Sequence, residues 1–154
     1  MKEQYDIHLK NLNECAKLAK KISKFIQPES FLCLYGDLGS GKTTFARFLI
    51  NSLADKKTKV LSPTFPILQT YDLSKIKIWH YDLYRISKKD EIFNLDFETA
   101  LKDCVIVEWP EIVKDFLPKN RIDFFFFEDK HFNRRVKIKF FGKIYKKELN
   151  EKIF

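Results

Sequence analysis

Three of the four glycines in this chain lie within six positions of one another, in the run GDLGSGKT of residues 36–43. The run has the spacing G-x-x-x-x-G-K-[ST], and glycines let the backbone wrap closely so that successive N–H groups point into one cavity. Such a cavity suits a chain of phosphates. Lys42 would add a positive charge toward the β- and γ-phosphates, and Thr43 would place a hydroxyl on Mg²⁺. The run therefore predicts a site for a nucleoside triphosphate with its magnesium ion.

Two acidic residues end apolar stretches and are candidates for a second magnesium ligand. Glu108 ends the stretch CVIVE, and Asp82 ends IKIWHYD. A phosphoryl-transfer site uses such an acid because the metal that it holds neutralises charge as the γ-phosphate leaves. The alternative for each residue is a solvated strand end or a helix cap. The phosphate-binding run favours the metal-site interpretation for both.

A threonine between two prolines is the candidate sensor of the γ-phosphate. In LSPTFP, residues 61–66, the two prolines hold Thr64 in a stiff loop, where its hydroxyl could respond to the phosphate and the metal. A simple proline turn between strands is the alternative. Without the phosphate-binding run, the turn would be the better interpretation.

Three further residues lie close in sequence to these candidates. His80 precedes Asp82 by two positions, and a histidine in an aromatic strand is more often packed than catalytic. Arg85 either pairs with Asp82, contacts phosphate or makes an ordinary surface ion pair. Trp109 follows Glu108, so it is a candidate neighbour of bound nucleotide, with core packing as the alternative.

Hydrophobic spacing predicts the elements that position these residues. The apolar run SFLCLY (30–35) and the amphipathic run TTFARFLINSLA (43–54) place a strand before the glycines and a helix after them. An earlier helix is expected from apolar residues at helical spacing between 12 and 26, with Asn11 or Asn13 as its cap. The remaining predictions are a hairpin (67–73 and 75–84), a partly helical acidic segment (87–103), a buried strand (104–108), a short helix (109–118) and two strands (121–129 and 134–141).

This order predicts an α/β protein with the P-loop NTPase fold. We expect a mixed, mainly parallel β-sheet flanked by helices on both faces, in a single P-loop domain over residues 1–154. Nothing in the sequence marks a linker or an internal repeat. The four consecutive phenylalanines, 124–127, are expected to lie in the core.

Composition limits the protein's surroundings and its partners. The N-terminus is charged and no stretch of 18 apolar residues occurs, so a cytoplasmic location is expected. Cys15, Cys33 and Cys104 lack metal-like spacing and are expected to be reduced and structural. The net charge of +8 permits contact with nucleic acid. Residues 130–154 form the most basic part of the chain, although a solvated basic face explains them equally well.

Four segments taken in this order, GDLGSGKTTF, SPTF, HYDLYR and VEWPE, resemble the TsaE family of bacterial P-loop ATPases. The resemblance covers nearly the whole chain, and HYDLYR followed by VEWPE is its specific part. It implies an ATP-binding and ATP-hydrolysing accessory protein for N6-threonylcarbamoyladenosine in tRNA. Such a protein would act on the TsaD and TsaB complex, would be stimulated by it, and would not itself transfer the threonylcarbamoyl group.

The resemblance also implies roles for individual residues. Catalytic roles fall on Lys42, Asp82 and Thr64, and the Mg²⁺ ligands would be Thr43 and Glu108. Cys15 stands where the family often has a threonine near the adenine. The strand HFNRRVKI fits the family's arginine-containing strand, and it leaves open whether Arg134 or Arg135 approaches the nucleotide, with Arg135 as our candidate. The full set expected to bind ATP, or ADP as product, is Leu38, Gly39, Ser40, Gly41, Lys42, Thr43, Thr44, Trp109 and Arg135.

Two alternatives to this function remain open. A small P-loop kinase shares the phosphate-binding run, but it needs a second substrate site and usually an arginine-rich lid, for which the second half of the chain offers no insertion. A nucleotide-gated module whose basic C-terminal segment holds tRNA is the other alternative. In the favoured reading, contact with tRNA is indirect or weak.

Overall fold

The computed structural model describes residues 3–142. The elements follow one another as the sequence predicts, with one additional strand at the N-terminus. They are β1 (Glu3–His8), α1 (Leu12–Ser23), β2 (Phe31–Tyr35), α2 (Lys42–Leu53), β3 (Leu68–Asp72), β4 (Lys77–Asp82), the 3₁₀ helix η1 (Lys89–Leu95), α3 (Phe97–Ala100), β5 (Cys104–Glu108), the 3₁₀ helix η2 (Pro110–Phe116), β6 (Arg121–Glu128) and β7 (Arg134–Phe141).

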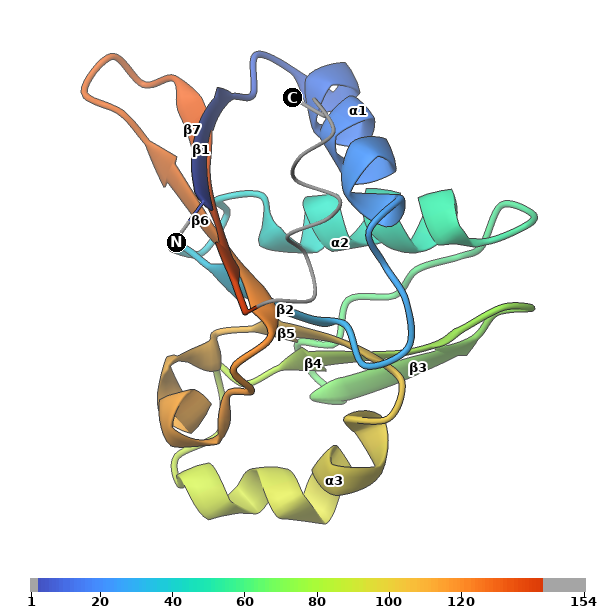
Figure 1. The fold of residues 1–154 in the computed structure, drawn as a ribbon. Helices are drawn as coiled ribbons and strands as arrows, with labels where there is room; N and C mark the ends of the chain where they lie inside the picture. The colour runs from blue at the N-terminus through green and yellow to red at the C-terminus, as the bar shows by residue number, and fades with distance from the viewer. Residues whose placement is uncertain (1–2, 143–154) are drawn as a thin grey trace.

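The seven described strands form one mixed sheet in the order β1-β7-β6-β2-β5-β4-β3 (Figure 1). The four central strands, β6, β2, β5 and β4, run parallel to one another. The outer strands join antiparallel: β3 and β4 form the expected hairpin, and β7 pairs antiparallel with both β6 and β1. The parallel centre brings the carboxyl ends of β2, β4 and β5 to one edge of the sheet, where ligands bind in open α/β sheets.

Helices cover the two faces of the sheet unequally. Helices α1 and α2 pack on one face, over a core that includes Leu32, Leu34 and Phe124. The shorter helices η1, α3 and η2 pack on the opposite face, over a second core that includes Phe31 and Cys33. Successive residues of β2 therefore serve opposite cores, as the two-residue period of a strand requires.

The phenylalanine run in β6 divides in the same way. Phe124 and Phe126 are buried under α1 and α2, whereas Phe125 is half-buried and Phe127 is 36% exposed on the other side of the sheet. The expectation that all four lie in the core is therefore wrong for Phe127. A continuous apolar run predicts burial on both faces, but no described helix covers this part of the second face.

Near the N-terminus, α1 is capped by a side chain and β1 adds a strand to the sheet. Asn11 caps α1, because its side-chain oxygen accepts a hydrogen bond from the Glu14 N–H at 2.9 Å. Strand β1 pairs with β7 along six residue pairs and extends the sheet beyond the predicted elements.

The three cysteines are buried and free, as expected. Within residues 3–142, no helix has both the length and the apolar character needed to cross a lipid bilayer.

Candidate functional site

The phosphate-binding run forms the turn between β2 and α2. Gly36, Gly39 and Gly41 all have positive φ values, of 148°, 76° and 108°. Gly41 is the N-cap of α2 and supplies no side-chain cap, so the first N–H groups of the helix are available to a ligand. The helix dipole adds partial positive charge at the same point, which favours an anion.

Lys42 is held inside this turn. Its side chain is only 5% exposed, and its ammonium group donates hydrogen bonds to the carbonyl oxygens of Gly36 at 2.5 Å and Asp37 at 2.9 Å. The ammonium nitrogen also lies 4.4 Å from the centroid of the Trp109 ring. Burial lowers the pKa of Lys42, while the nearby carboxylates of Glu108 and Asp82 oppose that shift. A buried cation bonded only to neutral carbonyls is well suited to meet a phosphate.

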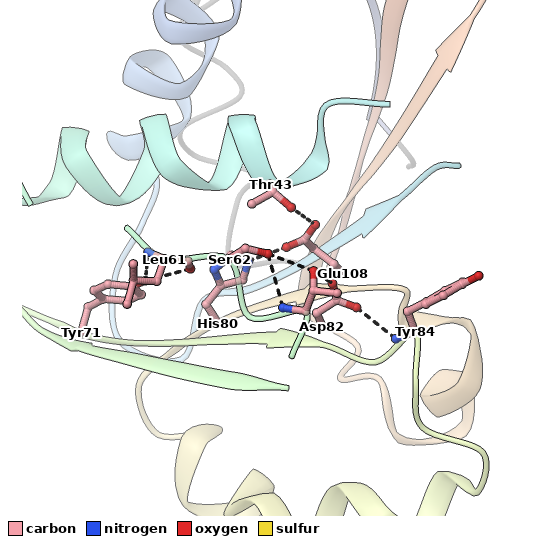
Figure 2. Close-up of polar contacts among 9 residues, drawn as sticks. Thr43, Leu61, Ser62, Tyr71, His80, Asp82, Tyr84 and Glu108 are labelled. Atoms are coloured by element: carbon pink, nitrogen blue, oxygen red, sulfur yellow. Dashed lines mark hydrogen bonds and ion pairs between the residues drawn. The ribbon is translucent and has the colours of Figure 1, made fainter. Parts of the chain in front are cut away.

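Glu108 connects the first turn of α2 to β4. One carboxylate oxygen, Oε1, accepts a hydrogen bond from the Thr43 hydroxyl at 2.7 Å, and the other, Oε2, lies 2.7 Å from Nε2 of His80 (Figure 2). His80 and Glu108 are both buried. The contact with His80 therefore positions the Glu108 carboxylate. The sequence alone did not distinguish this contact from ordinary packing of the histidine.

Asp82 lies beside Glu108, because the two residues are paired in the register of β4 and β5. Its Oδ2 atom accepts a hydrogen bond from the Thr64 hydroxyl at 3.0 Å. Its Oδ1 atom accepts one from the Tyr84 N–H at 3.0 Å (Figure 2). Ser62 Oγ lies 2.9 Å from the Thr64 hydroxyl. The proline-bracketed loop thus contacts the acid at the end of β4.

Lys42, Thr43, Thr64, Asp82 and Glu108 line one cleft of about 270 Å³. The cleft joins nearly all of the sequence-predicted candidates, although they come from four separate stretches of the chain. Its lining consists of Leu38, Gly39, Ser40, Gly41, Lys42, Thr43, Thr44, Thr64, Asp82, Glu108, Trp109 and Arg134.

Arg135 is not brought to this cleft, so the candidate arginine must be corrected. Successive residues of β7 face opposite sides of the sheet, and Arg134 is the one on the side of the phosphate-binding turn. Arg135 points the other way and pairs with Asp6 of β1 at 2.9 Å. Arg85 is also outside the cleft, with its guanidinium 5.2 Å from the centroid of the exposed Phe65 ring.

A second pocket of about 370 Å³ adjoins the first and shares Ser40, Gly41, Thr44 and Arg134 with it. It is of a size for a nucleoside base and sugar next to the phosphates. Cys15 lies in its lining, where burial raises the thiol's pKa to about 11. Sequence reasoning missed most of this pocket, since no motif marks its other residues, which are His8, Leu9, Lys10, Asn11, Leu12, Phe126, Phe132 and Asn133.

The cleft's oxygen atoms fit a magnesium ion. Thr43 offers a hydroxyl and Glu108 a carboxylate, and the two are already in contact. Magnesium suits such a sparse set, because it keeps several waters and binds through one or two protein oxygens plus phosphates. Ser40 Oγ, in the same cleft, is buried without a hydrogen-bond partner among the described residues.

Comparisons with known proteins agree with this geometry. The family model described as "Threonylcarbamoyl adenosine biosynthesis protein TsaE" matches residues 9–136. A protein named tRNA threonylcarbamoyladenosine biosynthesis protein TsaE from Rickettsia felis is 44% identical over 110 residues, which cover 71% of this chain and 64% of the relative. A protein of the same name from Bacillus subtilis is 34% identical over 112 residues, which cover 73% and 70%.

The fold has a solved counterpart. The crystal structure of YdiB from Bacillus subtilis superposes with a TM-score of 0.78 at 27% identity, covering 99% of this chain and 95% of that one. The chain spans a little under two thirds of the length of the first two curated relatives, which are 64% and 63% covered. The P-loop fold and the mixed sheet predicted from the sequence are confirmed.

Proposed function

This chain belongs to the TsaE family, and we propose that it binds and hydrolyses ATP in support of N6-threonylcarbamoyladenosine formation in tRNA. The observation that carries the proposal is the meeting of Lys42, Thr43, Asp82 and Glu108 in one cleft at the N-terminus of α2. A phosphate cradle, a hydroxyl–carboxylate pair for a metal and a second carboxylate are the parts that nucleotide hydrolysis needs.

The binding step uses the turn and its lysine. The triphosphate would lie against the N–H groups of residues 38–44, and Lys42 would exchange its bonds to Gly36 and Asp37 for bonds to phosphate oxygens. Thr43 and Glu108 would hold Mg²⁺, which when bound neutralises charge on the phosphates. Arg134 lies between the two pockets, so its guanidinium would contact the phosphates or the sugar.

The chemical step is in-line attack of water on the γ-phosphorus. The oxygen of water forms a bond to phosphorus, the bond to the β,γ-bridging oxygen breaks, and ADP and inorganic phosphate result. Asp82 would orient the water and accept its proton. Thr64 would contact the γ-phosphate, so that the loop of residues 61–66 responds to the bound triphosphate. Lys42 would stabilise the charge of the transition state. Trp109 packs against Lys42 and keeps the ammonium group at the cleft.

We further propose that the activity depends on Mg²⁺ and is stimulated by the homologues of TsaD and TsaB. The chain would reset that complex rather than transfer the threonylcarbamoyl group itself. A role in tRNA modification also supports the expected cytoplasmic location. A single P-loop ATPase domain over residues 1–154 remains our proposal, and the single sheet through the described residues supports it. Part of the basic segment proposed to meet tRNA, residues 143–154, lies outside the described residues.

The test is ATP hydrolysis by the purified chain, alone and with its TsaD and TsaB counterparts, with Lys42→Ala as the blank. Strong stimulation by the pair, lost with Lys42→Ala and with Mg²⁺ removed by chelation, supports the proposal. Hydrolysis that survives Asp82→Ala in the presence of the partners would remove Asp82 as the general base. Hydrolysis that the partners leave unchanged would point to the kinase alternative, and small-molecule acceptors would then be screened.

A further inference from the structure

The side of β6, β7 and β1 that faces away from α1 and α2 carries basic and aromatic residues. Cross-strand pairs place Phe125 beside Lys137, and Phe127 beside Arg135, on this side. Helices α1 and α2 pack only on the opposite side (Figure 1), and η1, α3 and η2 pack over the central strands. We call this surface the β6–β7 face, and it consists of Arg121, Asp123, Phe125, Phe127, Arg135, Lys137, Lys139 and Phe141 with Gln4, Asp6 and His8 of β1.

The β6–β7 face has a net positive charge. Its two acids are each paired with an arginine: Asp123 with Arg121 at 3.1 Å, and Asp6 with Arg135 at 2.9 Å. Four basic residues thus stand against two acidic ones. Lys137 and Lys139 have no salt bridge within residues 3–142, and they occupy the middle of the face on β7. Lys137 lies across from Asp6 and Lys139 across from Asp123, but both acids are bonded to arginines, so the face keeps an excess of positive charge for an acidic ligand.

The aromatic rings on the face are spaced between these charges. Phe125 stacks on Tyr35 with ring centroids 4.6 Å apart and planes 9° apart, which fixes its orientation. Lys139 lies 5.3 Å from the Phe125 centroid, and Lys137 lies 6.0 Å from that of Phe127. At 36% exposure, Phe127 presents its ring to solvent where an antiparallel edge sheet would ordinarily carry a polar side chain.

We propose that the β6–β7 face binds single-stranded RNA, such as a loop or an unpaired end. Sheet surfaces that bind unpaired RNA stack bases on exposed aromatic rings, and basic side chains between the rings neutralise the phosphates. Here Phe127 is the exposed ring, Phe125 and Phe141 are half-buried, and the lysines follow at two-residue spacing on the neighbouring strand. A purely acidic peptide without aromatic residues would use the lysines and leave the exposed Phe127 without a stacking partner.

The lysines of this face lie apart from the ATP cleft, although Phe127 at its edge lines a pocket with Leu38, Gly39 and Ser40 of the phosphate-binding turn. Residues of β7 alternate, so Arg134 lines the cleft while Arg135, Lys137 and Lys139 face the other side of the sheet. The proposal therefore goes beyond the ATPase proposed above and does not depend on it. RNA binding measured without nucleotide tests this face, and ATP hydrolysis tests the cleft, so either proposal can fail while the other stands.

The experiment measures binding of the full chain to a fluorescent single-stranded RNA of about 12 nucleotides by anisotropy, between about 50 and 200 mM salt. The double variant Lys137→Gln/Lys139→Gln should weaken binding about tenfold or more, and should reduce the slope of log affinity against log salt by about 1.4. Phe127→Ala should weaken binding about tenfold with the salt slope unchanged, because stacking carries no counterions.

The matched control is Lys88→Gln/Lys102→Gln, which makes the same change in net charge at exposed positions near η1 and α3. It should bind RNA within about twofold of the unaltered chain. Thermal unfolding of every variant shows whether it is folded. Equal binding by the unaltered chain and by Lys137→Gln/Lys139→Gln would overturn the proposal. Competition by poly-glutamate as strong as that by RNA, with Phe127→Ala unaffected, would overturn it in favour of an acidic protein partner.

Discussion

Arg134 and Arg135 are adjacent in the chain, yet the strand directs them to opposite sides of the sheet. Arg134 lines both pockets of the candidate site, whereas Arg135 pairs with Asp6. We expect Arg134→Ala to weaken ATP binding about tenfold, the usual cost of losing a charged hydrogen bond. Arg135→Ala should change the dissociation constant for ATP by no more than about twofold, because it removes a partly exposed ion pair.

Titration calorimetry with a non-hydrolysable ATP analogue measures both dissociation constants. Each variant removes one guanidinium from the same strand, so each is the control for the other. A larger loss of affinity for Arg135→Ala than for Arg134→Ala would contradict the assignment of Arg134 to the nucleotide.

The buried carboxyl of Asp123 makes the free energy of unfolding depend on pH in a predictable direction. Burial raises the pKa of its carboxyl, and the pairing with Arg121 only partly offsets that effect. A raised native pKa means that the folded state holds the proton more tightly than the unfolded state does. The stability contributed by this group is therefore fully present below its unfolded pKa and is lost as pH rises through its native pKa.

The variant Asp123→Asn has no such loss, because its amide does not ionise. The free energy of unfolding of Asp123→Asn, relative to the unaltered chain, should therefore rise between about pH 3 and pH 7. Urea unfolding of both proteins across this range gives the difference, in which the effects of the other carboxyls cancel. A difference that falls with pH would show that the Arg121 pairing dominates over burial.

At the scale of single residues, the sequence predicted those that belong to a motif and missed those that depend on partners. The spacing of GDLGSGKT identified Lys42 and Thr43, and strand ends identified Asp82 and Glu108. Which arginine enters the cleft depends on which residues of β7 face α1 and α2. Two adjacent arginines do not show which of them faces that side. His80 could not be assigned, because its bond to Glu108 joins residues 28 positions apart.

At the scale of elements, the turn between β2 and α2 sets different demands on its glycines. A Cβ atom added at Gly36, with φ of 148°, would lie 2.5 Å from Ser40 Oγ and 2.8 Å from the Phe126 carbonyl oxygen. At Gly39, with φ of 76°, an added Cβ would meet no atom within 4 Å. Gly39→Ala therefore bears only backbone strain, whereas Gly36→Ala adds a clash with the neighbouring strand.

We expect Gly39→Ala to lower the free energy of unfolding by about 1 kcal/mol and Gly36→Ala by about 3 kcal/mol. Gly36→Ala should also weaken ATP binding more, since its carbonyl is one of the two acceptors that hold Lys42. Urea unfolding and nucleotide titration measure these quantities. Equal destabilisation by the two substitutions would mean that the turn relaxes around the added methyl group.

The elements themselves were largely predictable, because their hydrophobic patterns are strong. The buried strand β5 and the hairpin of β3 and β4 follow directly from CVIVE and from the two apolar runs near residue 74. Strand β1 was missed, since EQYDIH has only two apolar residues to mark its alternation and lies in a charged terminus. Its strand conformation comes from pairing with β7, which no local pattern reveals.

For the whole molecule, β1 connects the two proposed activities. It covers the open edge of β7, and its last residue, His8, lines the pocket beside the phosphate cleft together with residues 9–12. On the other side of the sheet, Asp6 of β1 neutralises Arg135 on the β6–β7 face. One strand thus borders both the nucleotide pocket and the proposed RNA surface.

Removal of residues 1–8 should therefore have two separable effects. Loss of the six residue pairs with β7 exposes a strand edge that carries Val136, Ile138 and Phe140, so the truncated chain should aggregate on size-exclusion chromatography with light scattering. Loss of His8 from the second pocket should weaken ATP binding in the fraction that stays monomeric.

The control Asp6→Asn removes the ion pair but keeps the strand, and it should remain monomeric with unchanged ATP affinity. A monodisperse truncated chain that binds ATP normally would mean that β7 tolerates an open edge and that the base is held by α1 and the phosphate turn alone.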